Sequence, residues 1–261
     1  MIDIQKQRDY RHIPIDKVGI KGIRYPIKVL DKKSRGLQST VAEINMYVDL
    51  PHHCKGTHMS RFVEMLHLFR QQVSLESIIN ILEDMKHVLG AKSSHIEITF
   101  SYFIEKAAPV TGAKGLMDYT CSIIGSSAPD KSNDMVLKVA VPITSVCPCS
   151  KEISDYGAHN QRGEVLVSTR FKKFIWIEDI IELVEKSASC DVYSVLKRED
   201  EKYVTELGYN NPKFVEDVVR DVSQIMTQDE NITWFSVSAE NFESIHNHSA
   251  YAYIERGSYM K

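Results

Sequence analysis

Residues 126–134 read SSAPDKSND, a run of small, polar and turn-forming residues that predicts a connection between two structured segments. The elements predicted on its two sides follow the same order: strands, then helices, then strands. The two halves share this order without a convincing residue-by-residue identity, so the repeat is architectural. We therefore expect an amino-terminal extension at 1–15 and two modules, at 16–130 and 131–261.

The first half contains two amphipathic helices between strands. Residues 42–50 alternate apolar and polar side chains, the period-2 pattern of a strand with one buried face. Ser60 is the expected N-cap of the first helix, and the second is predicted to stop at Gly90. Strands follow around 96–105 and 116–125. The apolar stripes are Phe62, Met65, Leu66 and Phe69 in the first helix, and Ile78, Ile79, Leu82, Met85 and Leu89 in the second.

The second half repeats this pattern, with strands predicted at 135–144, 164–171, 233–240 and 249–256. Two helices lie between them, with apolar stripes at Ile177, Ile180, Ile181 and Val184, and at Val215, Val218, Val219, Val222 and Met226. Each half thus predicts an antiparallel sheet with helices on one face, an α+β fold. Because exposed strand edges must be covered or paired, we expect a homo-oligomer with sites near its subunit interfaces.

The composition is that of a globular protein, with 43% hydrophobic and 26% charged residues among 261. A formal net charge of −3 provides no basic excess for binding nucleic acid or an anionic membrane. The first residues lack the apolar run of a signal peptide, and no later segment has the apolar length that spans a bilayer. We expect a cytoplasmic protein without nucleic-acid or membrane partners.

A thiol and imidazole cluster marks residues 145–163. Cys147 and Cys149 flank a single proline, and His159 follows after a short loop. Thiolate and imidazole are ligands that borderline divalent metals prefer. A closed structural zinc site usually has four protein ligands in paired spacings, and no second cysteine pair exists, so an open catalytic site is favoured. Two structural thiols beside a turn histidine remain the alternative.

A second polar cluster lies between the last two predicted strands, where Glu240, Glu243, His246 and His248 stand close together. Carboxylates and imidazoles at such a position could act as general acids and bases or as metal ligands. A turn histidine is more often a solvated surface residue, and only the coincidence with a carboxylate and a separate thiol cluster argues against that reading.

Three further segments carry candidate residues with ordinary structural explanations. Glu201 lies in a charge-rich run that alone indicates a solvated face. Glu216 stands near a predicted helix start, where a carboxylate stabilises the helix dipole. Lys55, Thr57 and Arg61 surround another helix start, where amides and positive charge could bind a phosphate, although N-capping explains that segment equally well.

Six motifs together point to a known family. They are, in chain order, KGTHMSRF, SVCPCSKEIS, GAHNQRG, LKREDEKYVTE, NPKFVEDVVRD and ENFESIHNH. With them, the chain resembles the prokaryotic type IB GTP cyclohydrolase I family from about Lys55 to the carboxyl terminus. The resemblance implies the tunnelling fold, two tandem β-β-α-α-β-β modules assembled into an oligomeric barrel, here a homotetramer. It also implies that GTP and water become 7,8-dihydroneopterin triphosphate and formate, the first step of folate and deazaguanine nucleoside biosynthesis.

The resemblance further implies a role for each candidate residue. One divalent metal per site, zinc with manganese or iron as alternatives, would be held by Cys147, His159 and Glu201. Cys149 would lie near the purine C8, and Glu243, His246 and His248 would move protons. Glu216 would anchor the guanine edge of GTP, with Lys55, Thr57, Arg61 and Arg162 as further substrate-binding residues.

Three alternatives stay open. The same fold hosts several reactions, so a related pterin or deazapurine enzyme, such as a pterin synthase or a nitrile reductase, is one. A non-catalytic scaffold stabilised by metal at the cysteine and histidine cluster is another. The third is a thiol redox sensor that uses the close cysteine pair as its switch.

Overall fold

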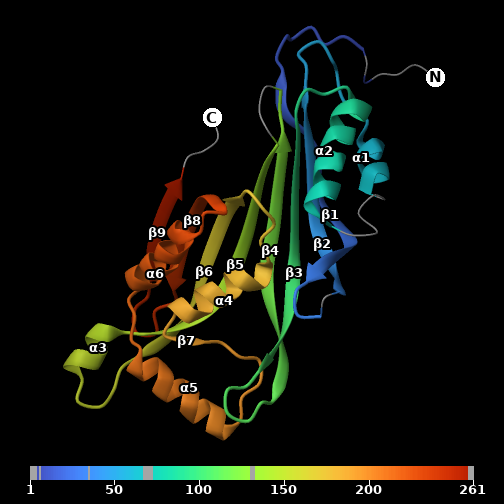
Figure 1. Cartoon of the computed structure of the whole chain (residues 1–261). Coiled ribbons are helices and arrows are strands. Elements are labelled where there is room, and N and C mark those ends of the chain that lie inside the picture. Colours follow the sequence, from blue (N-terminus) through green and yellow to red (C-terminus); the bar gives the residue numbers. More distant parts are fainter. Residues whose placement is uncertain (1–4, 6, 35, 67–72, 130–132, 258–261) are drawn as a thin grey trace. The chain divides into compact units, whose positions relative to one another are not determined.

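The computed structural model of the protein describes residues 5, 7–34, 36–66, 73–129 and 133–257 (Figure 1). Its elements are β1 (Ile15–Asp31), β2 (Gly36–Leu50), α1 (Met59–Met65), α2 (Leu75–Leu89), β3 (Ser94–Ala107), β4 (Lys114–Ser127), β5 (Asp134–Val146), α3 (Pro148–Ile153), β6 (Asn160–Phe171), α4 (Ile177–Ser187), β7 (Cys190–Asp191), α5 (Arg198–Asn210), α6 (Val215–Gln228), β8 (Ile232–Asn241) and β9 (Ala250–Gly257).

The chain divides into two compact units that are discontinuous in sequence. The first comprises Met1–Ser101 and Ser122–Leu137, and the second comprises Tyr102–Cys121 and Lys138–Lys261. Strands β3, β4 and β5 each contribute residues to both units, so these units differ from the modules expected at 16–130 and 131–261. The modules describe the order of elements along the chain, and that division stays a prediction.

In the first unit the strand order is β1-β2-β3-β4-β5, and both β1 with β2 and β2 with β3 pair antiparallel. The side chains of Ile44 and Ile98 are paired across β2 and β3 and are fully buried. Helix α2 packs on this sheet, because a β-carbon added at Gly125 would lie 3.0 Å from the side chain of Ile78 and 3.2 Å from that of Leu82. Glycine thus allows α2 to approach β4 closely.

The helix boundaries of the first unit confirm one prediction and correct another. Helix α2 ends at Gly90, whose φ of +65° is the left-handed conformation that glycine adopts readily. Helix α1 begins at Met59 with His58 at the N-cap, so the prediction of Ser60 as the cap is wrong. Ser60 lies inside the first turn, because the backbone N–H of Arg61 already bonds to the carbonyl of His58. The predicted apolar position Phe69 lies outside the described residues.

In the second unit the strand order is β3-β4-β5-β6-β8-β9, and β7 pairs with β5. Strands β6 and β8 pair antiparallel through Val167 and Val237, both fully buried. Helices α4 and α6 lie over this part of the sheet (Figure 1). Their predicted apolar stripes point into the core, with Val184 of α4 and Val222 of α6 fully buried.

The second half has more elements than the sequence predicts. Every predicted strand and both predicted helices are present, but α3, β7 and α5 are additional. Helix α5 carries no apolar stripe, because Asp200 and Gly208 are its buried residues, and hydrophobic periodicity therefore misses it. The simple repeat of strand, strand, helix, helix, strand, strand thus holds in the first half and is elaborated in the second.

These elements form an antiparallel sheet with helices packed on it, so the predicted α+β class is confirmed. Among the helices that the structure describes, none combines the length and the apolar character needed to cross a membrane.

Candidate active site

Local structure brings the first thiol and the imidazole together. Strand β5 ends at Val146, and Pro148 occupies the start of α3, where its fixed φ suits the first helical position. Cys147 is the N-cap, and its Sγ accepts a hydrogen bond from the N–H of Ser150 at 3.4 Å. The N–H of Cys147 donates to the carbonyl of His159 at 3.1 Å. Cys149, one residue beyond the proline, is exposed.

The ring of His159 has two polar neighbours at Nδ1. Its Nδ1 lies 3.0 Å from Oε1 of Gln161 and 3.3 Å from Oγ of Ser244, and its backbone N–H donates to Oγ of Ser150 at 3.2 Å. Gln161 itself is buried. Hydrogen bonding at Nδ1 orients the imidazole so that Nε2 is the nitrogen available to a ligand.

Gln161 also connects this imidazole to the second cluster. Its Nε2 donates to Oε1 of Glu243 at 3.4 Å, and Oε2 of Glu243 lies 3.8 Å from Nδ1 of His246. The rings of His246 and His248 follow, with centroids 5.1 Å apart. The Glu243 side chain is 13% exposed and that of His246 52%, so the chain of contacts runs outward to solvent. Two motifs far apart in the sequence therefore form one polar cluster.

Three residues of this cluster were not predicted from the sequence: Ser150, Gln161 and Ser244. A signal for Gln161 does exist, because it lies at an inward position of β6, alternating with the buried Gly163 and Val165. A polar side chain on the buried face of a strand needs a partner, which marks it as a positioning residue. No comparable pattern distinguishes the two serines.

Glu216 is exposed in the first turn of α6, the helix that the sequence predicts there. The segment just before this helix is fixed to the end of β5, since the N–H of Lys213 donates to the carbonyl of Val146 at 3.1 Å. Helix α6 thus begins beside the strand that leads into Cys147. Arg162 is exposed on β6, and its carbonyl accepts the N–H of Phe242 at 2.9 Å, one residue before Glu243.

Glu201 lies apart from this cluster within the unit. It is exposed in the first turn of α5, whereas the far end of that helix meets α3 through a 2.6 Å bond from Lys151 Nζ to the carbonyl of Tyr209. Tyr209 lies eight positions after Glu201 in the helix, about 12 Å along its axis. Within the described part of the chain, no three His, Cys, Asp or Glu side chains are grouped to hold a metal.

The residue before Glu201 fixes the start of α5. The Asp200 carboxylate accepts hydrogen bonds from the N–H groups of Val110, Thr111 and Lys197, and from the hydroxyl of Thr111 at 2.6 Å. Burial alone would raise the pKa of Asp200, but these hydrogen bonds outweigh it and hold the pKa well below its ordinary value. Because these hydrogen bonds hold Asp200, they also fix the position of Glu201 beside it.

The predicted substrate-binding residues Lys55, Thr57 and Arg61 belong to the first unit. Arg61 donates from Nη1 to the carbonyl of Val88 at 2.7 Å, so its guanidinium satisfies the last turn of α2. The backbone N–H of Lys55 donates to the carbonyl of Gln7 at 3.1 Å. These contacts hold the segment in place, and phosphate binding by these residues stays a prediction.

Burial separates two other thiols from those of the cluster. Burial raises the pKa of Cys190 to about 11 and that of Cys121 further. A thiol with so high a pKa carries little thiolate at neutral pH, which is the form that attacks electrophiles and binds metals. Cys147 and Cys149, which are half-buried and exposed, are thus better candidates for chemistry.

The fold identifies the class of the protein: it is a tunnelling-fold protein. Its structure is similar to that of uricase from Arthrobacter globiformis, with a TM-score of 0.55 over 94% of each chain, at 6% sequence identity. A urate oxidase mutant of Bacillus sp. TB-90 gives a TM-score of 0.56, again at 6% identity, over 93% of this chain and 98% of that one. At such identities the likeness concerns the fold alone, and it confirms the predicted fold class.

Within this class, the chain belongs to the type I GTP cyclohydrolase folE2 family, whose sequence pattern matches residues 1–252. It is 65% identical to the GTP cyclohydrolase FolE2 of Desulfosudis oleivorans over 98% of both chains. It is 62% identical to that of Syntrophus aciditrophicus, over 98% of this chain and 100% of the relative. The resemblance predicted from six motifs is therefore confirmed and extends through the first fifty residues.

Proposed function

We propose that this chain converts GTP and water to 7,8-dihydroneopterin triphosphate and formate with the help of a divalent metal, in the cytoplasm, as the first step of folate and deazaguanine nucleoside biosynthesis. Its membership of the family makes it a GTP cyclohydrolase. The observation that carries the finer proposal is the polar cluster from Cys147 through His159, Gln161 and Glu243 to His246. Such a cluster suits a reaction with several proton transfers.

In this proposal Glu216 selects the base. A carboxylate accepts two hydrogen bonds at once, which matches the N1–H and 2-amino donors of guanine, whereas adenine lacks this pair. The exposure of Glu216 leaves its carboxylate accessible to a ligand. Glu216 follows Lys213 by three residues, and the N–H of Lys213 bonds to the carbonyl of Val146, the residue before Cys147. This contact supports a role for Glu216 beside the Cys147 segment.

The proton-transfer groups in this proposal are Glu243, His246 and His248. Opening the five-membered ring, releasing C8 as formate, rearranging the sugar and closing the new ring each require protons to move between nitrogen, oxygen and carbon. The 3.8 Å pair of Glu243 and His246 and the neighbouring ring of His248 provide a carboxylate and two imidazoles in one short segment. The exposed thiol of Cys149 would lie near C8, where it could act on the substrate directly.

The residues present suit a divalent metal by their donor chemistry. Cys147 and His159 are adjacent through a backbone hydrogen bond, and Gln161 orients the imidazole as a second partner usually does in metal sites. A metal held by these two residues and Glu201, zinc or alternatively manganese or iron, would supply Lewis-acid activation of water. Because Glu201 stands in the first turn of α5, at the opposite end from the Lys151 contact, completing this set requires that the start of α5 approach the cluster or that another copy contribute its Glu201.

The decisive experiment is a turnover assay with defined metal content. The purified protein is stripped with a chelator, reloaded separately with zinc, manganese or iron(II), and incubated with GTP. We expect formate and, after oxidation, a fluorescent pterin, and no product with ATP. Absence of formate with all three metals would contradict the proposal. Formate together with a cyclic phosphate product would instead indicate a related enzyme of the same fold.

A further inference from the structure

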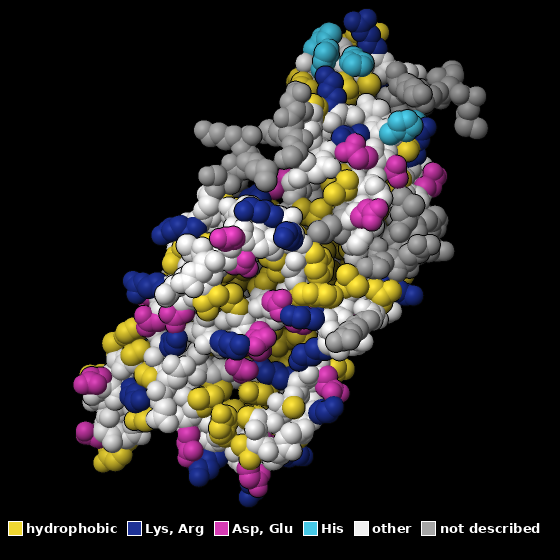
Figure 2. All heavy atoms as spheres, viewed as in Figure 1, with side chains coloured by type: hydrophobic (Ala, Val, Ile, Leu, Met, Phe, Trp, Pro, Cys, Tyr) yellow, Lys and Arg dark blue, Asp and Glu magenta, His cyan; other side chains and the backbone are white. Residues whose placement is uncertain are grey.

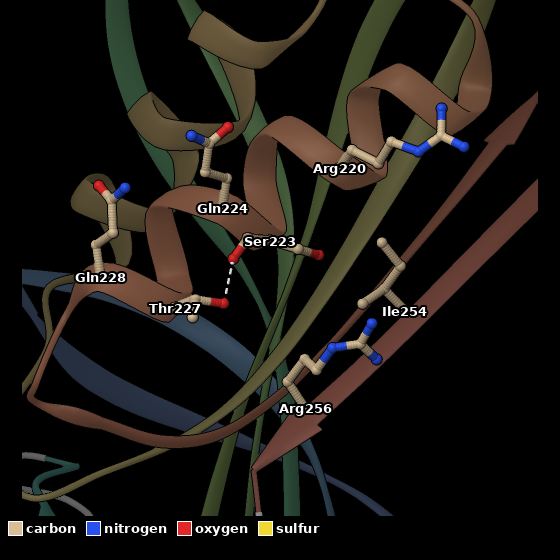
Figure 3. Close-up of a pocket in the computed structure, with 7 residues that line it drawn as sticks. All are labelled: Arg220, Ser223, Gln224, Thr227, Gln228, Ile254 and Arg256. Atoms are coloured by element: carbon tan, nitrogen blue, oxygen red, sulfur yellow. Dashed lines mark hydrogen bonds between the residues drawn. The ribbon is translucent and has the colours of Figure 1, made fainter.

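Helix α6 and strand β9 border a pocket of about 280 Å³ in the second unit (Figure 3). From the helix, Arg220, Ser223 and Thr227 face it, together with Gln224. These positions are spaced by three and four residues, so they share one face of α6. From β9, Ile254 and Arg256 face the pocket, because side chains two residues apart lie on the same side of a strand.

The pocket is positively charged. It is lined by two arginines, and none of its described lining residues is acidic. Among the described residues, Arg220 has one weak, exposed ion pair, 3.7 Å from Asp217, and Arg256 donates a hydrogen bond from Nη1 to the carbonyl of Glu255. The Glu255 carboxylate is itself bonded to Trp234 and to a tyrosine hydroxyl. Both guanidinium groups therefore keep donors for a further partner.

A buried hydroxyl also faces this space without a partner. Ser223 is 7% exposed, and its Oγ has no hydrogen-bond partner among the described residues. Figure 3 shows this hydroxyl directed from α6 toward β9, between the two arginines. A buried polar group left unpaired is costly, so a bound acceptor would offset that cost. The hydroxyl and the two guanidinium groups thus mark where a ligand acceptor would bind.

The β9 end of the pocket is remote from the polar cluster described above, whereas Arg220 lies one helical turn after Glu216. Arg256 pairs with Phe235 near the start of β8, whereas Glu243 follows the end of that strand at Asn241. The six steps along β8 from Phe235 to Asn241 span about 20 Å. Figure 2 shows acidic and basic side chains interspersed over the face that it displays, whereas the described residues that line this pocket include two arginines and no carboxylate.

We propose that the α6–β9 pocket is a second binding site, for a small phosphate-bearing anion. Guanidinium groups bind phosphate through paired, charge-assisted hydrogen bonds, and a serine hydroxyl adds a donor. A volume near the lower end for ligand sites fits inorganic phosphate, pyrophosphate or a small phosphate monoester. The glutamine amides of α6 would contact the remainder of a monoester. This site goes beyond the proposed function.

The test is calorimetric titration of the full-length protein with inorganic phosphate, pyrophosphate and ribose 5-phosphate at constant ionic strength. We expect binding, weakened by about tenfold or more in Arg220→Gln and in Arg256→Gln, since each removes a charged hydrogen bond. Ser223→Ala should weaken binding several-fold without lowering the thermal midpoint, because the hydroxyl has no partner to lose. Arg24→Gln, which removes the same charge from exposed β1, is the control. The three titrants distinguish a free phosphate from a phosphorylated metabolite.

Several outcomes would overturn this proposal: no binding of any titrant, equal weakening by Arg24→Gln, or unchanged binding in both pocket variants. The oligomeric state of the arginine variants is measured by light scattering. If these variants changed the oligomeric state and kept the phosphate affinity, the pocket would belong to an interface between copies. GTP turnover is measured in parallel, and we expect Arg256→Gln to retain it. If the wild-type protein bound phosphate but did not turn over GTP, the proposed function would be refuted and the proposed phosphate site would not.

Discussion

At the scale of single residues, Glu216 illustrates how one carboxylate admits two explanations. Its position in the first turn of α6 suits stabilisation of the helix dipole, which is worth a few tenths of a kcal/mol to about 1 kcal/mol at an exposed site. Its exposure equally suits a ligand contact. The two roles differ in what they affect, since the dipole changes stability and base recognition changes turnover.

We predict that Glu216→Gln lowers kcat/KM for GTP by about two orders of magnitude or more, because an amide cannot accept both guanine donors and presents a donor of its own. The urea midpoint should change little. Glu206→Gln, the same substitution at an exposed position of α5, is the matched control and should retain turnover. Unchanged kcat/KM in Glu216→Gln would leave helix stabilisation as its role.

A second residue-scale prediction separates the two close cysteines. We expect Cys147→Ala and His159→Ala each to lower bound metal, and Cys149→Ala to retain metal but lose turnover, because three ligands and water suffice for an open catalytic site. Elemental analysis of the purified variants measures this. Cys54→Ala, a half-buried thiol of the first unit, controls for cysteine removal. Equal metal loss from the Cys149 and Cys147 variants would mean that both sulfurs ligate.

At the scale of elements, α5 is held by its ends rather than by a buried apolar face. The Asp200 carboxylate binds its start to the turn between β3 and β4, and Lys151 binds its end to α3, with Nζ also 4.4 Å from the ring centre of Tyr209. Such a helix depends on polar contacts, and its stability should therefore depend on pH.

We predict that Asp200→Asn lowers the urea midpoint at pH 7 and that the difference from the wild type shrinks below about pH 4. The pKa of Asp200 is lower in the folded protein than in the unfolded chain, near 3.9. A lowered pKa stabilises the fold above the unfolded pKa, and this contribution is lost as the pH falls toward the folded value. Urea unfolding at pH 7, 5, 4 and 3 measures it, and a difference that does not vary with pH would contradict this account.

For the whole molecule, the exposed edge of the sheet favours pairing with another copy of the chain. Strand β9 ends the strand order of the second unit, and Tyr251 on it is 64% exposed. An exposed edge with aromatic side chains is a site where another strand pairs, unless charge or a covering segment prevents it. We therefore propose closed pairing between copies in a homotetramer, as the family resemblance implies.

We predict a molar mass of four chains by light scattering, and a shift toward smaller species in Tyr251→Lys, because a charge on an edge strand disfavours pairing. Far-UV circular dichroism should be unchanged in this variant. Tyr156→Lys, at a fully exposed loop position, is the control and should keep the wild-type mass. A monomeric wild-type protein would contradict closed pairing.

Most of the secondary structure, and the members of each motif, follow from local patterns along the chain. Period-2 and period-3.6 patterns report local burial, which is why β2, β8, α2 and α6 were predicted, and why α5, with no apolar stripe, was not. The turn at Gly90 was equally local, since only the backbone conformation at one residue decides it. The six motifs also sufficed to indicate the family.

Which motifs lie next to one another depends on the pairing and packing of distant segments. Antiparallel pairing of β6 with β8 sets Gly163 opposite Asn241, and so brings Gln161 to Glu243 across 82 positions of sequence. The tertiary structure also placed Glu201 at the start of α5, at the opposite end from the contact with α3, and engaged the Arg61 guanidinium with the last turn of α2. Strand register and helix docking depend on packing between distant segments, and a periodic pattern along one segment carries no information about its partner.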